Sequence, residues 1–477
     1  MRVLQVASEM FPLIKTGGLA DVVGSLPTAL IAEQVETAVL LPGYPGLLSQ
    51  LEWQETETNI RLPGDLGTVS ILKAAAQEDN VARFAVQADH WFNRPGPPYG
   101  PDARSSWPDN HMRFAVLAAS AVALVKTVWQ ADIIHAHDWH AGLCGAYLKL
   151  DSEINIPLVF TIHNLAYQGI FDATILPDLG LPWDMFNLDG LEYYDQVSYM
   201  KGGINFADRV TTVSPGYASE IQTSEFGHGL EGLLAYRGDV LKGILNGVDY
   251  TLWNPQTDTE ITQNFAANKL QDRCVNKVSL CEKFGLSSQS NPLVGVISRF
   301  TSQKGLDLLL DALPEAISAG INFVILGSGD EYLESGFSTI ATQHSEQVGI
   351  FLGYDEALAH QIYAGADALL IPSRFEPCGL TQLYAMRYGA LPVARRTGGL
   401  ADTIIDLSEH ANTGTGFLFD EQSPAELLQC LQRMQQTWHN TNQWRLSMQQ
   451  AMSMDFGWDV AAKNYRALYQ SLYLEIT

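Results

Sequence analysis

Short, unbroken runs of apolar residues recur along this chain, and segments with helical periodicity lie between most of them. The runs are rich in valine, isoleucine and leucine, which is typical of parallel strands covered on both faces of a sheet. The alternation predicts the α/β class. The predicted strands are RVLQVA, TAVLLP, DIIHAH, PLVFTIHN and RVTTVS in the first half, and PLVGVIS, NFVILG, ALLIPS and LPVAR in the second.

This pattern starts twice. PLVGVISR restarts it much as MRVLQVAS begins the first half, and the intervening GILNGVDYTLWNP carries the Asn-Gly, Asp and Asn-Pro signals of turns. We therefore predict two Rossmann-like, doubly wound domains at residues 1–245 and 246–455, followed by a last segment at 456–477. Ligands of such sheets bind at the carboxyl ends of the strands, which predicts a site in a cleft between the domains.

The charge of the chain limits its partners. Lysine and arginine number 28 against 53 aspartates and glutamates, so the net charge is −25. Nucleic acid or an anionic membrane would need a basic face, and we expect neither as a partner. A neutral polymer is indifferent to this charge. For an anionic substrate, the few cations must be concentrated at its site.

The cysteines are sparse and show no C-x-x-C spacing, which indicates a reducing compartment and no structural metal. No signal or transit peptide is visible before the first predicted strand, and the longest apolar run, at 114–125, is too short to span a bilayer. We therefore expect a cytoplasmic protein. The five cysteines are Cys144, Cys274, Cys281, Cys378 and Cys430.

The hexapeptide TGGLAD occurs twice, and its first copy spans residues 16–21. Gly17 and Gly18 lie where a helix begins, so free N–H groups and the positive end of the helix dipole favour an anion there. A turn that merely needs two glycines is the alternative. Lys15 and Asp21 beside the glycines favour the binding loop.

Two cations open the second half of the chain. Arg299 ends its first predicted strand and Lys304 begins the next helix, a combination that can clamp a diphosphate. Two solvated surface charges are the alternative, but in so acidic a chain basic residues at a predicted cleft are more informative. Further on, the EPCGLT loop directs Glu376 toward the predicted cleft. The N–H groups of Leu380 and Thr381 open a helix that can seat a phosphate.

The segment HAHDWH combines imidazoles with a carboxylate. Zinc binding is one interpretation, but a hydrogen-bonding cluster for a polyol is favoured because His135 and His137 end a predicted strand and point the same way. TIHNLAYQG similarly brings His163 and Asn164 to a strand end. A small, partly buried thiol is favoured over a nucleophile at Cys378, which has no base partner nearby in the sequence. No P-loop, G-x-G-x-x-G or D-x-D pair is present, so a dehydrogenase or NTPase is poorly supported.

Taken together, these motifs resemble one family. In order and over essentially the whole chain, they are similar to the bacterial and plastidial glycogen and starch synthases that use ADP-glucose. The segments that carry the resemblance are KTGGLADVVGSLP, HAHDWHAGL, TIHNLAYQG, ADRVTTVSP, EFGHGLEGLL, ILNGVD, SRFTSQKG and PSRFEPCGLTQLYAMRYG. The resemblance implies a glycosyltransferase B fold, in which two Rossmann-like domains surround a deep cleft. It also implies that the last helix, here 458–473, crosses back onto the first domain.

The resemblance implies transfer of glucose from ADP-glucose, with retention, to the 4-hydroxyl at the non-reducing end of an α-1,4-glucan such as glycogen, starch or a malto-oligosaccharide. No metal or other cofactor is expected, because fixed cations and helix N-termini can stabilise the charge that grows on ADP. Front-face attack is expected, with the departing phosphate taking the acceptor proton. The backbone carbonyl of His163 is a candidate to stabilise the oxocarbenium-like carbon.

The same resemblance implies the roles of individual residues. The catalytic residues would be Lys15, Asp21, Asp138, His163 and Glu376. ADP-glucose would be bound by Lys15, Gly18, Arg299, Lys304, Tyr354, Cys378, Gly379, Leu380 and Thr381, with Tyr354 facing adenine. Contacts to the glucan or its sugars would come from Trp91, Trp139, His140, Asn164 and Asn246.

Two positions depart from related patterns. Tyr384 stands where many related retaining transferases carry a second glutamate, and the synthases also lack that glutamate. Phe92, in WFNRPGPPY, stands where the family usually has a tyrosine, which leaves donor affinity and nucleotide choice open; Trp91 can instead offer a face for glucan stacking. Two alternative functions are a related transferase with another donor or a small acceptor, and a non-catalytic glucan-binding protein. The non-catalytic alternative is disfavoured because Glu376, Arg299 and Lys304, whose loss would mark such a protein, are all present.

The second TGGLAD copy, at residues 397–402, follows the EPCGLT loop. That loop can already supply the phosphate contacts, so two interpretations stay open. Gly398 and Gly399 form either a second substrate loop or a tight turn that only lets a helix pack closely.

Overall fold

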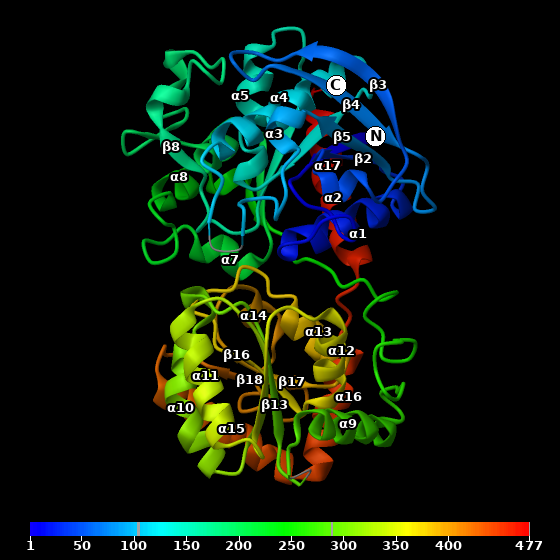
Figure 1. Ribbon diagram of the computed structural model, residues 1–477, viewed down its shortest axis with the longest axis vertical. Helices are drawn as coiled ribbons and strands as arrows, with labels where there is room; N and C mark the ends of the chain where they lie inside the picture. The colour runs from blue at the N-terminus through cyan, green and yellow to red at the C-terminus, as the bar shows by residue number, and fades with distance from the viewer. Residues whose placement is uncertain (103–104, 288–289, 477) are drawn as a thin grey trace. The chain divides into compact units, whose positions relative to one another are not determined.

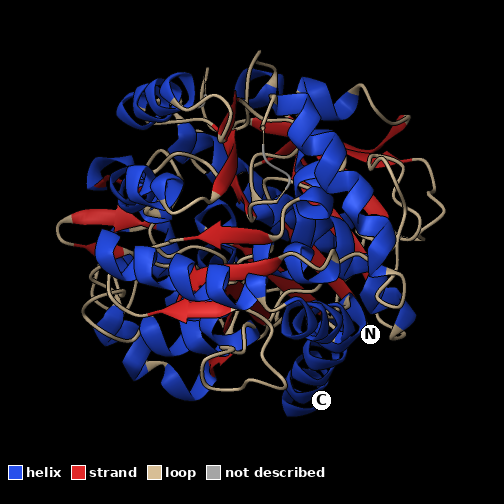
Figure 2. Ribbon diagram, turned by 90° about the horizontal axis from the view of Figure 1, so that it is seen from below, coloured by secondary structure: helices blue, strands red, loops and turns tan. Residues whose placement is uncertain are grey.

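The computed structural model describes residues 1–102, 105–287 and 290–476. It divides into two compact units, which we call unit 1 and unit 2. Unit 1 comprises Met1–Gly247 and the segment that begins at Trp458, and unit 2 comprises Val248–Gly457. Helices flank the strands in both units, so the predicted α/β class is confirmed (Figures 1 and 2).

Unit 1 is built on a sheet of strand order β12-β11-β7-β6-β1-β2-β5-β4-β3. Neighbouring strands are parallel from β12 to β5, whereas β4 and β3 are antiparallel additions at one edge. The predicted apolar runs correspond to β1, β2, β6, β7 and β11, and β5 and β12 lie outside them. A small separate sheet has the order β8-β10-β9. The bounds are β1 (Arg2–Val6), β2 (Glu36–Pro42), β3 (Trp53–Arg61), β4 (Thr68–Ala74), β5 (Ala82–Gln87), β6 (Ile133–His137), β7 (Leu158–Ile162), β8 (Ile170–Asp172), β9 (Glu192–Tyr193), β10 (Gln196–Ser198), β11 (Arg209–Thr212) and β12 (Leu241–Gly243).

The helices of unit 1 follow the expected order. The apolar run 114–125 forms most of a buried helix, α4. The bounds are α1 (Gly18–Ala32), α2 (Pro45–Leu48), α3 (Asp89–Phe92), α4 (Asn110–Thr127), α5 (Cys144–Leu150), α6 (Tyr199–Phe206), α7 (Pro215–Glu220), α8 (Glu231–Tyr236) and α17 (Trp458–Ile476).

The helix α17 completes the core of unit 1 although it comes last in the chain. It packs against α1, and its buried face shares one cluster with residues of β1, β6 and β7 (Figure 1). Tyr465, Tyr469 and Leu472 are almost fully buried in this cluster. The side chain of Tyr469 reaches His135 on β6, with its hydroxyl oxygen 2.7 Å from Nδ1.

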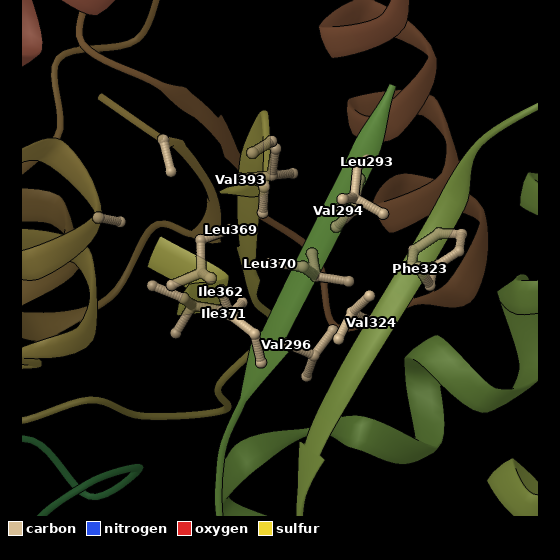
Figure 3. Packing of buried hydrophobic residues seen from close by; sticks show 14 of the residues in the cluster. Leu293, Val294, Val296, Phe323, Val324, Ile362, Leu369, Leu370, Ile371 and Val393 are labelled. Carbon is tan, nitrogen blue, oxygen red and sulfur yellow. The ribbon is translucent and has the colours of Figure 1, made fainter. Parts of the chain in front are cut away.

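Unit 2 is built on a sheet of order β15-β14-β13-β16-β17-β18 in which neighbouring strands are parallel. Apolar side chains from both faces of its strands form a single core cluster (Figure 3). The bounds are β13 (Leu293–Ile297), β14 (Asn322–Gly327), β15 (Val348–Leu352), β16 (Ala368–Ile371), β17 (Leu391–Arg395), β18 (Phe417–Phe419), α9 (Cys274–Phe284), α10 (Leu306–Ser318), α11 (Glu331–Gln343), α12 (Glu356–Gly365), α13 (Thr381–Arg387), α14 (Gly398–Thr403), α15 (Pro424–His439) and α16 (Thr441–Ser453).

Tyr384, at the position that departs from related transferases, belongs to this core. Its ring stacks on Trp253 with a centroid separation of 3.9 Å, and Trp253 also stacks on His360 at 4.0 Å. Trp253 lies in the irregular segment that opens unit 2. The aromatic residue at position 384 therefore fastens this segment to the sheet layer.

Candidate active site residues

In unit 2, Glu376 and Lys304 come together from separate segments. Lys304 lies just before α10, and Glu376 lies in the loop between β16 and α13. The Lys304 Nζ is 2.7 Å and 2.9 Å from the two carboxylate oxygens, and the Ser373 hydroxyl donates to the same carboxylate at 2.7 Å. Glu376 and Ser373 are both buried. These charge-assisted bonds fix the position of both charged groups.

The rest of the Glu376 loop has a backbone that demands glycine at one position. Gly379 has a φ of +71°, and a Cβ there would lie 2.3 Å from Oε1 of Gln382. Cys378 is buried. Leu380 precedes the first residue of α13, Thr381, and no side chain caps this helix start.

Two other predicted donor residues of unit 2 are exposed. Arg299 lies in the loop after β13, which ends at Ile297, so the prediction that Arg299 ends the strand is off by two residues. Tyr354 is 74% exposed between β15 and α12, and its hydroxyl donates to the carboxylate of Glu356. The ring faces of Tyr354 are thus open to a planar ligand.

In unit 1, Asp138 has an unusual backbone. Its φ of 56° and ψ of −179° lie in a region that is essentially reserved for glycine. The Asp138 carboxylate accepts hydrogen bonds from the backbone N–H groups of His163, at 2.8 Å, and Asn164, at 3.3 Å. These bonds join the ends of β6 and β7 and hold the strained residue. Burial raises the pKa of Asp138 to about 7.

The histidines before Asp138 face the protein interior. His135 and His137 are fully buried; His135 contacts Tyr469 and Thr161, and His137 contacts Gln5 and His163. The prediction that both belong to a polyol-binding cluster is therefore wrong, because their ring nitrogens already have protein partners. They do point the same way, with ring centroids 4.2 Å apart.

The first TGGLAD copy is bonded to a buried carboxylate, Glu9, that no sequence motif indicates. The Glu9 carboxylate accepts hydrogen bonds from the N–H groups of Thr16 and Gly17, the latter at 3.2 Å. Of the two glycines whose N–H groups were expected to be free for an anion, Gly17 is thus bonded to protein. Lys15 forms an ion pair with Asp21 at 3.0 Å. Burial raises the pKa of Glu9, against the effect of its hydrogen bonds.

Tyr99 joins this loop to the residues near Asp138. Its hydroxyl donates to Glu9 and lies 2.8 Å from the Ser8 hydroxyl, and its ring stacks on His140 at 4.7 Å. By contrast, Phe92 is buried against Tyr44. A side chain at position 92 therefore fills the core rather than a binding surface. Within WFNRPGPPY, the tyrosine that contacts the predicted site residues is the last one, Tyr99.

Two hollows lie in unit 1. One, of about 450 Å³, has Trp139, Tyr167, Gln168 and Tyr193 in its wall. The other, of about 440 Å³, includes Trp91, whose indole N–H donates to the carbonyl of Leu66. The two tryptophans predicted to contact sugar thus lie in different hollows. The remaining predicted sugar contact, Asn246, is buried, and its side-chain oxygen has no hydrogen-bond partner among the described residues.

Within the described residues, no group of three or more His, Cys, Asp or Glu side chains is arranged to hold a metal ion. In the same part of the chain, no helix has the length and apolar character needed to cross a membrane.

Comparisons with known proteins identify the family of this chain. A family model described as the starch synthase catalytic domain matches residues 2–236, and one described as glycosyl transferases group 1 matches 291–437. A glycogen synthase of Rhodopseudomonas palustris is 49% identical over 100% of this chain and 99% of its own length. Glycogen synthase 2 of Bradyrhizobium diazoefficiens is 46% identical over 99% and 98%, respectively.

Solved structures give the same result. The catalytic domain of starch synthase IV from Arabidopsis thaliana, bound to ADP and acarbose, matches with a TM-score of 0.90 and 34% identity over 99% of each chain. A sucrose-phosphate synthase from Thermosynechococcus elongatus, at 17% identity and a TM-score of 0.61, shares the fold alone. The fold and the family models define a glycosyltransferase of the B type. Within that class, the chain belongs to the glycogen and starch synthase family.

Proposed function

We propose that this protein is a retaining glucosyltransferase that moves glucose from ADP-glucose to the 4-hydroxyl at the non-reducing end of an α-1,4-glucan. Membership of the glycogen and starch synthase family supports the reaction class. The starch synthase IV structure contains ADP, the leaving group that an ADP-glucose donor would release.

The ion pair between Lys304 and Glu376 carries the donor side of this proposal. The lysine is held by a buried carboxylate that itself has a second donor, Ser373, so the charges are already oriented before substrate binds. A preorganised cation needs little rearrangement as negative charge grows on the departing diphosphate. We assign this role to Lys304 and to Arg299, with the sugar bound beside Glu376 and adenine against Tyr354. On the basis of family membership, we also assign donor contacts to Cys378, Gly379, Leu380 and Thr381.

Asp138 and His163 carry the unit 1 side. Holding Asp138 in its backbone conformation costs about 1–3 kcal/mol, and residues under such strain cluster at functional sites. We propose that Asp138 contacts the transferred glucose, and that the His163 carbonyl stabilises positive charge on its anomeric carbon. The departing phosphate would take the proton of the acceptor hydroxyl on the same face of the sugar. Lys15, Asp21 and Gly18 are proposed to contribute from the first TGGLAD loop.

The hollow beside Trp139 suits a glucan acceptor. Aromatic side chains offer faces to the apolar side of sugar rings, and Gln168 offers a buried side-chain oxygen without a hydrogen-bond partner among the described residues. Leaving a buried acceptor without a hydrogen bond costs free energy, so a ligand hydroxyl that donates to this oxygen would be stabilised. A neutral polymer is also not repelled by a net charge of −25.

We further propose that the transfer needs no metal and takes place in the cytoplasm. Fixed cations can serve the diphosphate without a divalent ion. All five cysteines are free thiols, which suits a reducing compartment.

Incubation with labelled ADP-glucose and glycogen tests the function. We expect labelled α-1,4-glucan and an equal amount of ADP, with unchanged rates in excess EDTA. A parallel reaction with UDP-glucose tests donor choice, and one with a small sugar in place of glycogen tests acceptor choice. Failure to incorporate glucose from either nucleotide would contradict the proposal. Label found only in a small product would favour the alternative transferase.

A further inference from the structure

The second TGGLAD copy is bonded to the loop that carries Glu376. Gly399, near the start of α14, donates its backbone N–H to the carbonyl oxygen of Glu376 at 3.0 Å. That N–H is therefore occupied by a protein oxygen, unlike a free phosphate seat. The contact joins the connection after β17 to the connection after β16 within unit 2.

Two buried side chains close a hydrogen-bonded ring around this contact. Thr403 donates its hydroxyl to the Gly399 carbonyl at 2.6 Å. Gln382 donates to the Thr403 hydroxyl at 3.2 Å and to the Cys378 carbonyl at 2.9 Å. Gln382 and Thr403 are 0% and 2% exposed, so water does not compete for these bonds. The loop backbone is thus held at both the Glu376 and the Cys378 carbonyl.

The contact also explains why position 399 is glycine. A Cβ there would lie 1.9 Å from the Cys378 carbonyl oxygen and 2.5 Å from the Cys378 carbonyl carbon. Both are backbone atoms of the Glu376 loop, so the clash could be relieved only by moving that loop or α14. In the first copy, by contrast, the backbone N–H groups of Thr16 and Gly17 donate to the Glu9 side chain.

We propose that the second TGGLAD copy is a backbone brace that positions Glu376 for glucosyl transfer. Gly399 and Thr403 are positioning residues in this proposal: they act through the Glu376 loop. The brace fixes the backbone of the Glu376 loop. It thereby fixes the position in which the Glu376 carboxylate contacts Lys304 and Ser373, and the start of the turn at Gly379. This inference rests on the proposed glucosyltransferase function.

The test compares Gly399→Ala with the wild-type protein. Relieving a 1.9 Å contact requires a shift of about 1 Å, and a displacement of this size can cost about a hundredfold in rate. We expect kcat with ADP-glucose and glycogen to fall about a hundredfold at a temperature where the variant is folded. The KM for glycogen should stay within about threefold, since a loss confined to the transition state leaves ground-state binding intact.

Two further comparisons separate positioning from loss of stability. Gly295→Ala is the matched control: its Cβ would lie 2.5 Å from Ile362 in the core of the same unit, so it should lower stability and leave kcat unchanged. Thr403→Val removes the hydroxyl that donates to the Gly399 carbonyl and accepts from Gln382, and it should lower kcat about tenfold, whereas Thr403→Ser keeps the hydroxyl and should retain the wild-type kcat. The Thr403 pair decides the question if Gly399→Ala does not fold.

The outcomes distinguish this inference from the proposed function. Active wild-type protein with unchanged kcat in folded Gly399→Ala would overturn the brace. An equal loss of kcat in Gly295→Ala, or equal kcat in Thr403→Val and Thr403→Ser, would do so too. Inactive wild-type protein would instead refute the function on which the brace rests.

Discussion

At the scale of single residues, the pair formed by Lys304 and Glu376 gives the sharpest prediction. Glu376→Ala and Lys304→Ala should each lower turnover by at least about a hundredfold, the scale of losing one transition-state contact. Steady-state kinetics on folded protein measures this. Near-normal turnover in both variants would refute the assignment.

The same unit offers a matched control. Lys277 and Asp367 form a comparably close and buried ion pair, at 2.6 Å, with no part in the proposed chemistry. Lys277→Ala should reduce the free energy of unfolding because it leaves a buried carboxylate unpaired. It should leave the turnover of folded protein unchanged.

The buried histidines make stability depend on pH. Burial lowers the pKa values of His135, His140 and His163 to about 3, and that of His137 well below its usual value. As pH falls through about 6.5, these histidines become protonated in the unfolded chain but stay neutral in the folded protein. Below that pH, each histidine lowers the free energy of unfolding by about 1.4 kcal/mol per pH unit. Asp138 acts in the opposite sense between its unfolded and folded pKa values, and offsets about one histidine.

Urea unfolding at pH 8 and at pH 5 measures this effect, and we expect a large loss of stability at the lower pH. His135→Gln is the comparison variant: with one histidine fewer, its stability should depend less steeply on pH. Equal stability of the wild-type protein at both values would contradict the neutral state of these rings.

Part of the candidate site was predictable from local sequence, and part was not. Lys304 and Glu376 were predicted as site residues because each lies in a segment expected at the end of a strand, where a charged side chain can bind substrate. The role of Glu9 was hidden because its partners come from a loop and from Tyr99, which lies 90 residues away. His135 and His137 were misjudged because a strand end does not show which face of the sheet is filled.

At the scale of elements, apolar runs located the central parallel strands, and the helix predicted from Lys304 corresponds to α10, which begins at Leu306. The strand β3 was not predicted because it is exposed or half-buried along its whole length. Its partner β4 has buried residues, but polar residues interrupt them, so it shows no unbroken apolar run. Antiparallel edge strands with mixed polarity leave little periodic signal.

Helix α17 permits a matched test of its packing. Leu472 is 1% exposed and Leu474 is 76% exposed on the same helix. Leu472→Ala should lower the free energy of unfolding by about 2–5 kcal/mol, since it leaves a cavity in the unit 1 core. Leu474→Ala should change it by no more than about 0.5 kcal/mol. Denaturant unfolding that gives equal effects would contradict the described burial.

At the scale of the whole molecule, the sequence predicted two α/β halves, and each unit has its own sheet and core. Most parallel strands could be predicted because burial on both faces makes them continuously apolar. The parallel strands β5, β12, β15 and β18 lie outside the predicted runs. Contacts between loops could not be predicted, since they join residues that are far apart in the sequence and leave no local pattern.

The overall charge gives a prediction about binding. Sedimentation with glycogen should be nearly independent of salt concentration, because a neutral polymer releases no counterions. Duplex DNA serves as the contrasting polymer, and we expect no binding to it even at low salt, given a net charge of −25. A steep fall of glycogen binding with salt would contradict this account of recognition.

The position of α17 has a consequence for synthesis. Translation releases unit 1 first, yet the helix that covers Val3, Val22 and Leu26 emerges only after all of unit 2 has left the ribosome. Domains usually fold as they emerge, N-terminal first. Here the first domain made is the last one finished, so its apolar groove stays open during elongation. Nascent chains stalled before Trp458 should therefore recruit chaperones that bind exposed apolar surface.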